Sequence, residues 1–139
     1  DADLLISEVT PNMLKFDQLN KLSTQIQSTI KSTSALEKYS LNLWKATKNP
    51  EKYNIKISGI DTERLIVSGA SPRGISMMMK CARVNAWLNN RTSILPEDIH
   101  AIFHETIAHR LVFNPVYELK RTEISRELSN EILNKVSVT

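Results

Sequence analysis

The chain of 139 residues has little glycine, a single cysteine and no long apolar run. Its three glycines argue against a glycine-rich phosphate loop and against a turn-rich β architecture, and they favour helices. Cys81 alone cannot form an internal disulfide, which fits a reducing compartment. No apolar run is long enough to cross a membrane, and the acidic start of the chain differs from a signal peptide. We therefore expect a cytoplasmic protein that does not enter a membrane.

Neither sign of charge dominates the sequence. The formal net charge is +3, and the lysines and arginines are spread along the chain, which argues against nucleic acid as the partner. The 41% of hydrophobic residues and the length suit one globular domain with its own core. The chain opens without methionine and reaches three apolar residues, 4–6, at once. We interpret it as part of a longer polypeptide.

Helix start signals recur along the chain and predict an all-α bundle of about five helices. The predicted helices begin near Pro11 with Thr10 as cap, at a capping box from Ser34 to Glu37, at Ser71-Pro72, at Pro96 and near Thr122. The residues expected to face inward are Leu36, Tyr39, Leu43, Trp44, Ile75, Met78, Met79, Ala82, Ala86, Ile99, Ile102, Phe103, Thr106, Ile124, Leu128 and Ile132. The helix after Pro72 is apolar nearly all round and is expected to be central.

Residues 49–68 are the least regular part of the sequence. Asn49-Pro50 ends the preceding helix at about Lys48, because the residue before a proline disfavours the helical conformation. Gly59 and Asp61 indicate a turn. We predict a long irregular loop over 49–68, with a short helix from Asp61 to Ile66.

Several residue patterns resemble catalytic or metal sites, but their spacing or position argues against that chemistry. His104 and His109 are five residues apart, whereas a zinc-protease helix needs its two histidines four apart. His100 and His104 have the right spacing but lie on the polar side, so exposed histidines are the better interpretation. Cys81 is interpreted as a buried, inert thiol, and the methionines at 77–79 as core residues.

A basic cluster lies at the end of the helix before Asn49. Lys45, Lys48 and Lys52 occur near Trp44 and Tyr53, a combination that can bind a nucleic-acid strand. A solvated helix end, where lysines meet the negative pole of the helix dipole, is the favoured interpretation.

Arg73 has a more specific position, in the first turn of the helix that follows Ser71-Pro72. A helix N-terminus attracts phosphate through its free N–H groups and its dipole, and an arginine adds a two-pronged donor. Gly69 and Ala70 give a tight approach to this helix start. The alternative is a well-formed helix start with a solvated Arg73, which physical reasoning alone favours.

The segment Gly69-Ala70-Ser71-Pro72-Arg73-Gly74 resembles the sequence that opens the main lid helix of MoxR-type AAA+ ATPases. Further segments resemble the same family in the same order and spacing: Leu43–Lys48, Ala82-Arg83 with Ala86, Arg91, Leu95–Ile99 and His109–Leu111. The resemblance extends from about residue 11 to about residue 136. Leu95 departs from the family's capping Thr or Ser, which predicts a lost hydrogen bond of about 1 kcal/mol.

The resemblance implies a helical C-terminal lid at residues 11–139, connected by residues 1–10 to a separate ATPase core. It implies that ATP binds at the junction and that Arg73 is the second sensor, contacting the phosphates. The helix start that presents it consists of Gly69, Ala70, Ser71 and Pro72. Arg110 is typical of the family, and we expect a structural role for it.

For the whole protein, the resemblance implies ATP and Mg²⁺ as cofactors and a ring, usually a hexamer, whose subunits contact one another through core and lid. Members of the family are thought to remodel or mature protein complexes, often with von Willebrand factor A-domain partners. The chain by itself lacks the phosphate loop and the magnesium-binding acid, so we expect it to be inactive.

Two other functions remain open at this point. One is a protein-interaction module that uses residues 49–68 and the C-terminal helix and ignores nucleotide. The other is a basic helical nucleic-acid binder, whose affinity would fall steeply with salt.

Overall fold

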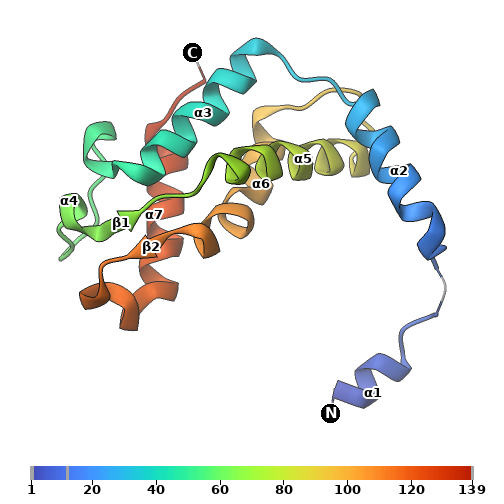
Figure 1. Ribbon diagram of the computed structural model, residues 1–139, viewed down its shortest axis with the longest axis horizontal. Helices are drawn as coiled ribbons and strands as arrows, with labels where there is room; N and C mark the ends of the chain where they lie inside the picture. The colour runs from blue at the N-terminus through green and yellow to red at the C-terminus, as the bar shows by residue number, and fades with distance from the viewer. Residues whose placement is uncertain (1, 12, 139) are drawn as a thin grey trace.

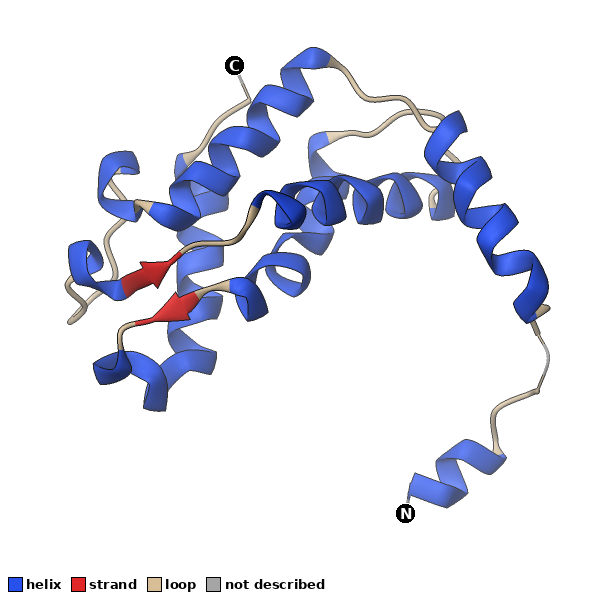
Figure 2. Cartoon of the chain, viewed as in Figure 1, coloured by secondary structure: helices blue, strands red, loops and turns tan. Residues whose placement is uncertain are grey.

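The computed structural model describes residues 2–11 and 13–138. Figures 1 and 2 show a mainly helical molecule with one small pair of strands. The elements are, in chain order, α1 (Ala2–Ser7), α2 (Phe16–Thr29), α3 (Ser34–Lys48), η1 (Pro50–Tyr53), α4 (Thr62–Leu65), β1 (Ile66–Ser68), α5 (Pro72–Leu88), α6 (Pro96–Ile107), η2 (Ala108–Arg110), β2 (Val112–Phe113), η3 (Pro115–Lys120) and α7 (Arg121–Lys135). The prediction of a helical fold is confirmed. Within the described residues, no helix combines the length and the apolar character that crossing a membrane requires.

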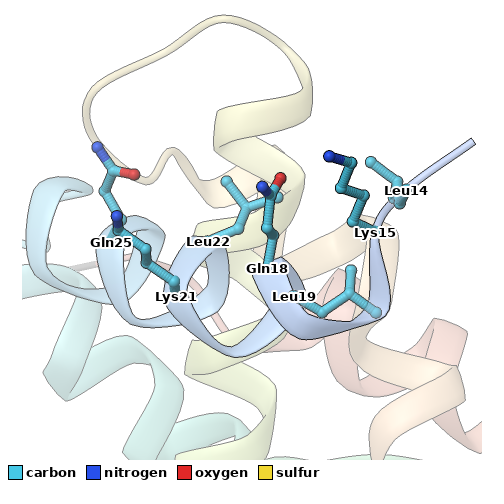
Figure 3. Close-up of a pocket in the computed structure, with 7 residues that line it drawn as sticks. All are labelled: Leu14, Lys15, Gln18, Leu19, Lys21, Leu22 and Gln25. Carbon is cyan, nitrogen blue, oxygen red and sulfur yellow. The ribbon is translucent and has the colours of Figure 1, made fainter.

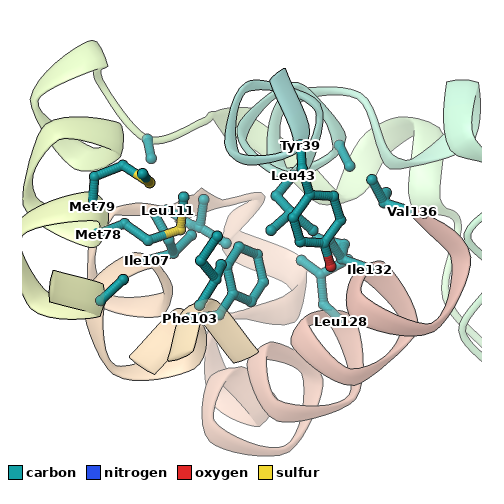
Figure 4. Close-up of a cluster of buried hydrophobic side chains, with 14 of the residues drawn as sticks. Tyr39, Leu43, Met78, Met79, Phe103, Ile107, Leu111, Leu128, Ile132 and Val136 are labelled. Carbon is teal, nitrogen blue, oxygen red and sulfur yellow. The ribbon is translucent and has the colours of Figure 1, made fainter. Parts of the chain in front are cut away.

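The centre of the fold is the pair α5 and α6, which make the most extensive contact between any two elements. Helix α3 packs on α5 and on α7, α7 packs on α6, and α2 packs on α5. Figure 4 shows how α3, α5, α6 and α7 each contribute side chains to one cluster. The fully buried members of largest volume include Tyr39, Leu43, Met78, Ile99, Phe103, Ile107, Leu128 and Ile132. Burial of these apolar side chains is the main stabilising term of the fold.

Helix α2 begins at Phe16, so the predicted start at Pro11 with Thr10 as cap is wrong. Lys15 occupies the cap position and its side chain makes no capping hydrogen bond. A proline permits a helix start without requiring one, and a short helical turn needs tertiary packing to persist. Thr10, Pro11 and Leu14 are exposed, and the first buried residue of α2 is Ile26.

Helix α3 ends at Lys48 as predicted, but its cap is Thr33 rather than Ser34. The Thr33 hydroxyl accepts from the backbone N–H of Leu36 at 3.3 Å. Thr33 has the extended backbone of a cap residue, with φ −96° and ψ 155°. Ser34 is already helical, so the predicted capping box is shifted by one residue.

The segment 49–68 contains more regular structure than the predicted loop. It holds η1, α4 and β1, and α4 is the predicted short helix, with the Asp61 carboxylate accepting from Glu63 N–H at 3.2 Å. Strand β1 pairs antiparallel with β2, with Ile66 opposite Phe113 and Ser68 opposite Val112. The Asn114 N–H donates to the Leu65 carbonyl at 2.8 Å and extends this pairing. Two strands this short have no sequence signal of their own.

Helix α5 begins at Pro72 as predicted, but only part of its surface is buried. Met78 and Met79 are in the core, whereas Met77 is 38% exposed and Leu88 is 66% exposed. Cys81 is half-buried rather than buried, and it lines a groove of about 480 Å³ between α2 and α5. Helix α5 is central, as predicted, but part of its apolar surface stays exposed because α2 covers it incompletely.

Candidate functional site

Arg73 lies in the first turn of α5, directly after Ser71 and Pro72. Ser71 has the backbone of a cap residue but its side chain makes no capping hydrogen bond, and the helix start is fixed by Gly74 N–H donating to the Ser71 carbonyl at 2.7 Å. The Arg73 side chain is exposed and makes no hydrogen bond or ion pair with any residue that the structure describes. No acidic residue occupies the first turn of α5. The first turn of α5 therefore combines the positive pole of the helix with an exposed guanidinium that has no ionic partner among the described residues, an arrangement that suits an anion.

The two residues that precede this helix start are packed against the end of α3. The Trp44 indole Nε1–H donates to the Ala70 carbonyl at 2.6 Å, and Ala70 is fully buried. A Cβ atom on Gly69 would lie 2.3 Å from Cγ and 3.1 Å from Cα of Lys48. Glycine is therefore required here for close approach, as the sequence predicted, and the element approached is α3.

On its other side, the first turn of α5 packs against the end of α6. A Cβ atom on Gly74 would meet Cβ of Ala70 at 3.2 Å, Cδ of Arg110 at 3.4 Å and Cδ1 of Ile107 at 3.6 Å. Arg110 Nε–H donates to the Thr106 carbonyl at 3.0 Å. These contacts give Arg110 a packing role, in agreement with the structural role expected for it.

Arg91 and Asp98, which lie in two of the segments used for the resemblance, form one buried polar group. Asp98 is fully buried, and its carboxylate forms an ion pair with Arg91. The same carboxylate accepts from Asn85 Nδ2 at 2.8 Å and from Leu95 N–H at 2.8 Å. The helix start at Leu95 lacks a side-chain cap, as predicted. The hydrogen bond that Leu95 N–H donates to the Asp98 carboxylate compensates for the missing cap. These residues stabilise the connection between α5 and α6.

Two of the three histidines, His100 and His104, make side-chain contacts between helices. His100 is exposed, as predicted, and its Nε2 lies 2.8 Å from the Tyr39 hydroxyl. His104 is half-buried, with Nδ1 2.9 Å from the Ser129 hydroxyl, so its predicted place on the exposed side is wrong. The prediction failed because α7 covers that side of α6. Among the described residues, no three histidine, cysteine or acidic side chains gather in a way that could hold a metal ion.

The lysines of the basic cluster at the end of α3 have different surroundings. Lys48 places its ammonium 4.5 Å from the centre of the Trp44 ring, which is cation–π geometry. Lys45 and Lys52 are exposed. The Trp44 ring is thus occupied by a residue of its own chain, which weakens the interpretation of this cluster as a nucleic-acid site.

A hollow of about 370 Å³ lies along the first half of α2 (Figure 3). Its lining residues are Leu14, Lys15, Gln18, Leu19, Lys21, Leu22 and Gln25. It contains neither Arg73 nor a carboxylate, thiol or imidazole, so it offers no set of catalytic groups. The candidate site remains the start of α5.

The sequence predicted the place of Arg73 and the tight approach at Gly69. It did not predict the hydrogen bond from Trp44 to Ala70, because the two residues are 26 positions apart. The only signal was indirect, since the segments Leu43–Lys48 and Gly69–Gly74 both resemble one family. The structure shows that these two segments are in contact.

The model of the AAA lid domain family matches residues 60–134, more than half of the chain. The chain is 39% identical over 136 residues to Protein MoxR of Methylorubrum extorquens and 37% identical over 121 residues to Protein MoxR of Paracoccus denitrificans. These matches cover 98% and 87% of the chain but only 40% and 36% of the two relatives. It is 30% identical over 105 residues, 76% of the chain and 26% of the relative, to Chaperone MoxR1 of Mycobacterium tuberculosis.

A crystal structure named as that of an ATPase from Cytophaga hutchinsonii has the same fold, with a TM-score of 0.73 and 30% sequence identity. The match covers 83% of this chain and 33% of the other. Sequence and structure therefore agree on the family. The chain belongs to the AAA lid domain family, and it is the kind of lid that MoxR-type AAA+ ATPases carry.

Proposed function

We propose that this lid closes over ATP bound by a preceding ATPase core and that Arg73 contacts the nucleotide phosphates. The observation that carries the proposal is the exposed Arg73 guanidinium, without a partner among the described residues, at the positive end of α5. A guanidinium donates two parallel hydrogen bonds to phosphate oxygens and keeps its charge at any physiological pH. In this proposal residues 1–10 connect the lid to the core.

The residues of the chain fit this one contact to ATP and no larger share of the nucleotide site. Among the described residues, no group of acidic side chains is gathered to hold Mg²⁺. The phosphate loop, the metal and the attacking water therefore belong to the core in this proposal. Bound ATP supplies the phosphoryl group, and Arg73 stabilises the negative charge on its oxygens as the bond to the leaving group breaks.

Lid closure of this kind couples hydrolysis to movement, because Arg73 can reach the phosphates only when lid and core approach each other. In a ring of subunits, such movement is transmitted to neighbours and from them to a client protein complex. The name of the Mycobacterium relative, a chaperone, supports this part of the proposal. A von Willebrand factor A-domain partner belongs to the same proposal.

The test is steady-state ATP hydrolysis by the complete gene product. We expect Arg73→Ala to lower kcat/KM by roughly 100-fold, the usual effect of removing one preorganised donor from a transition-state charge. Arg73→Lys keeps the charge without the two-pronged geometry, so its kcat/KM should lie between those of the wild type and Arg73→Ala.

Arg64→Ala is the matched control. Arg64 is also exposed, and among the described residues its side chain pairs only with Asp61, at 3.7 Å. Its loss should leave hydrolysis unchanged. Normal turnover in Arg73→Ala would remove Arg73 from the nucleotide site and make a nucleotide-independent interaction module the better interpretation.

A further inference from the structure

The hydrogen bond from Trp44 to Ala70 ties the backbone just before α5 to helix α3. Ala70 directly precedes Ser71, the cap residue, so its carbonyl lies just outside the helix and is not part of the helical hydrogen-bond ladder. The Trp44 Nε1–H donates to it at 2.6 Å. The Ala70 carbonyl is buried with its residue, and a buried carbonyl needs such a partner.

The Lys48 side chain approaches both Gly69 and the Trp44 ring and adds a second contact. Its stem passes so close to Gly69 that a Cβ there would be 2.3 Å from Lys48 Cγ. Its ammonium lies 4.5 Å from the centre of the Trp44 ring. Lys48 and Trp44, both near the end of α3, therefore each contact the backbone that leads into α5 or one another.

The first turn of α5 is thus held by α3 at Ala70 and by α6 at Gly74. Arg73 lies between these two points in the sequence, and its side chain makes no hydrogen bond, ion pair or ring contact with the described residues. The direction in which its guanidinium leaves the lid is set by the backbone that carries it. That backbone is fixed from the α3 side through Trp44.

We propose that Trp44 is a positioning residue for Arg73. Its indole N–H, together with the packing of Lys48 on Gly69, holds the start of α5 so that Arg73 reaches the nucleotide phosphates. This inference rests on the proposed function and goes beyond it, because it assigns control of the sensor to a side chain on a different helix. Catalytic geometry tolerates little error, and a displacement of about 1 Å can cost on the order of 100-fold in rate.

The decisive experiment compares Trp44→Phe in two backgrounds of the complete gene product, with Arg73 intact and with Arg73→Ala. Phenylalanine keeps one aromatic ring, and it removes the N–H donor together with the second ring of the indole. We expect Trp44→Phe to lower kcat/KM for ATP about tenfold when Arg73 is present and less than about twofold when it is absent. Such non-additivity is the sign of one residue acting through another, and a general loss of stability would not produce it.

Trp87→Phe is the matched control. Trp87 lies near the other end of α5, is 41% exposed, and its indole N–H makes no hydrogen bond within the described part of the chain. Its replacement should leave hydrolysis unchanged in both backgrounds. Melting temperatures of all variants establish that the lid is folded.

The remaining outcomes overturn the inference. An equal loss from Trp44→Phe in both backgrounds, or no loss in either, shows that Trp44 does not act through Arg73. Failure of the proposed function looks different, because Arg73→Ala alone then hydrolyses ATP normally. Should Trp44→Phe unfold the lid, Gly69→Ala takes its place, since the new Cβ pushes the same backbone away from Lys48 and predicts the same non-additivity.

Discussion

Asp98 is the charged side chain that the fold buries most completely. It forms an ion pair with Arg91 and accepts hydrogen bonds from Asn85 and from the Leu95 backbone. The Arg91 side chain is 31% exposed, so water compensates part of its charge when the partner is lost. The Asp98 carboxylate thus joins the end of α5 to the start of α6.

We expect Asp98→Ala to lower the free energy of unfolding by about 2–3 kcal/mol, because it leaves the donors of Arg91 and Asn85 without their acceptor. Urea unfolding monitored by circular dichroism measures this change. Glu97→Ala, at an exposed neighbouring position, is the control and should cost less than about 1 kcal/mol. Equal effects of the two substitutions would contradict the stabilising role of the buried Asp98 carboxylate.

Tyr39 makes stability depend on pH in the alkaline range. Burial raises the pKa of the Tyr39 hydroxyl above its ordinary value of 10.0. Above pH 10 the unfolded chain releases this proton while the folded chain keeps it, so rising pH favours unfolding. The free energy of unfolding should therefore fall from pH 10 upward by at most about 1.4 kcal/mol per pH unit.

Urea titrations of the wild type and of Tyr39→Phe between pH 9 and pH 11.5 test this dependence. The variant lacks the ionisable hydroxyl, so its stability should decline less steeply over this range. Parallel curves for the two proteins would assign the decline to other groups. His100 contacts the hydroxyl and is exposed, so water can replace this contact in the variant.

At the scale of elements, the start of α3 gives a direct test of which residue caps it. Thr33→Ala removes the acceptor for Leu36 N–H and should destabilise the chain by about 1 kcal/mol. Ser34→Ala replaces a helical serine with a better helix former and should be neutral or slightly stabilising. The reverse order, measured by thermal or urea unfolding, would restore Ser34 as the cap.

The elements that the sequence predicted well begin at a cap followed by proline. Ser71-Pro72 and Leu95-Pro96 fix the starts of α5 and α6, because proline supplies the backbone angle of the first helical turn. Pro11 shows the limit of this rule, since Met13, Leu14 and Phe16 are exposed and the helix begins only at Phe16. Local signals permit a helix start, and tertiary packing selects it.

The two strands could not be predicted for a different reason. Strand β1 exists because it pairs with β2, 44 or more residues away, and its own sequence of three residues has no useful period. Within the site, the position of Arg73 follows from its local sequence. Its attachment to Trp44 depends on how α3 lies across α5, which no local pattern specifies.

At the scale of the whole molecule, the first helix lies apart from the bundle (Figure 1). The large apolar side chains of this region are mostly exposed: Leu4, Leu5, Ile6, Val9, Met13 and Leu14 are each at least 62% exposed. Side chains that remain in water contribute little to stability. The bundle should therefore fold without this region.

Removal of residues 1–13 should change the free energy of unfolding by less than about 1 kcal/mol. Urea unfolding of residues 14–139 beside the whole chain measures the difference. A loss well above that value would show that the N-terminal segment packs on the bundle in solution.

The chain by itself should not hydrolyse ATP. It supplies Arg73 in this proposal, while the groups that bind Mg²⁺ and orient water belong to the core. A phosphate-release assay on the purified chain with Mg²⁺ and ATP should equal the rate without protein. ATP hydrolysis that co-purifies with the folded chain and persists in Arg73→Ala would contradict the proposal that the core supplies all the other catalytic groups.

The two tryptophans of the chain also differ in their surroundings, and this difference gives the lid an optical signal. Trp44 is half-buried, with its N–H bonded and an ammonium above its ring, whereas Trp87 is 41% exposed. Iodide should quench the fluorescence of Trp87 more than that of Trp44. In Trp87→Phe, the emission that remains in this chain comes from the indole bonded to Ala70. Its wavelength and lifetime then report directly on whether the start of α5 moves.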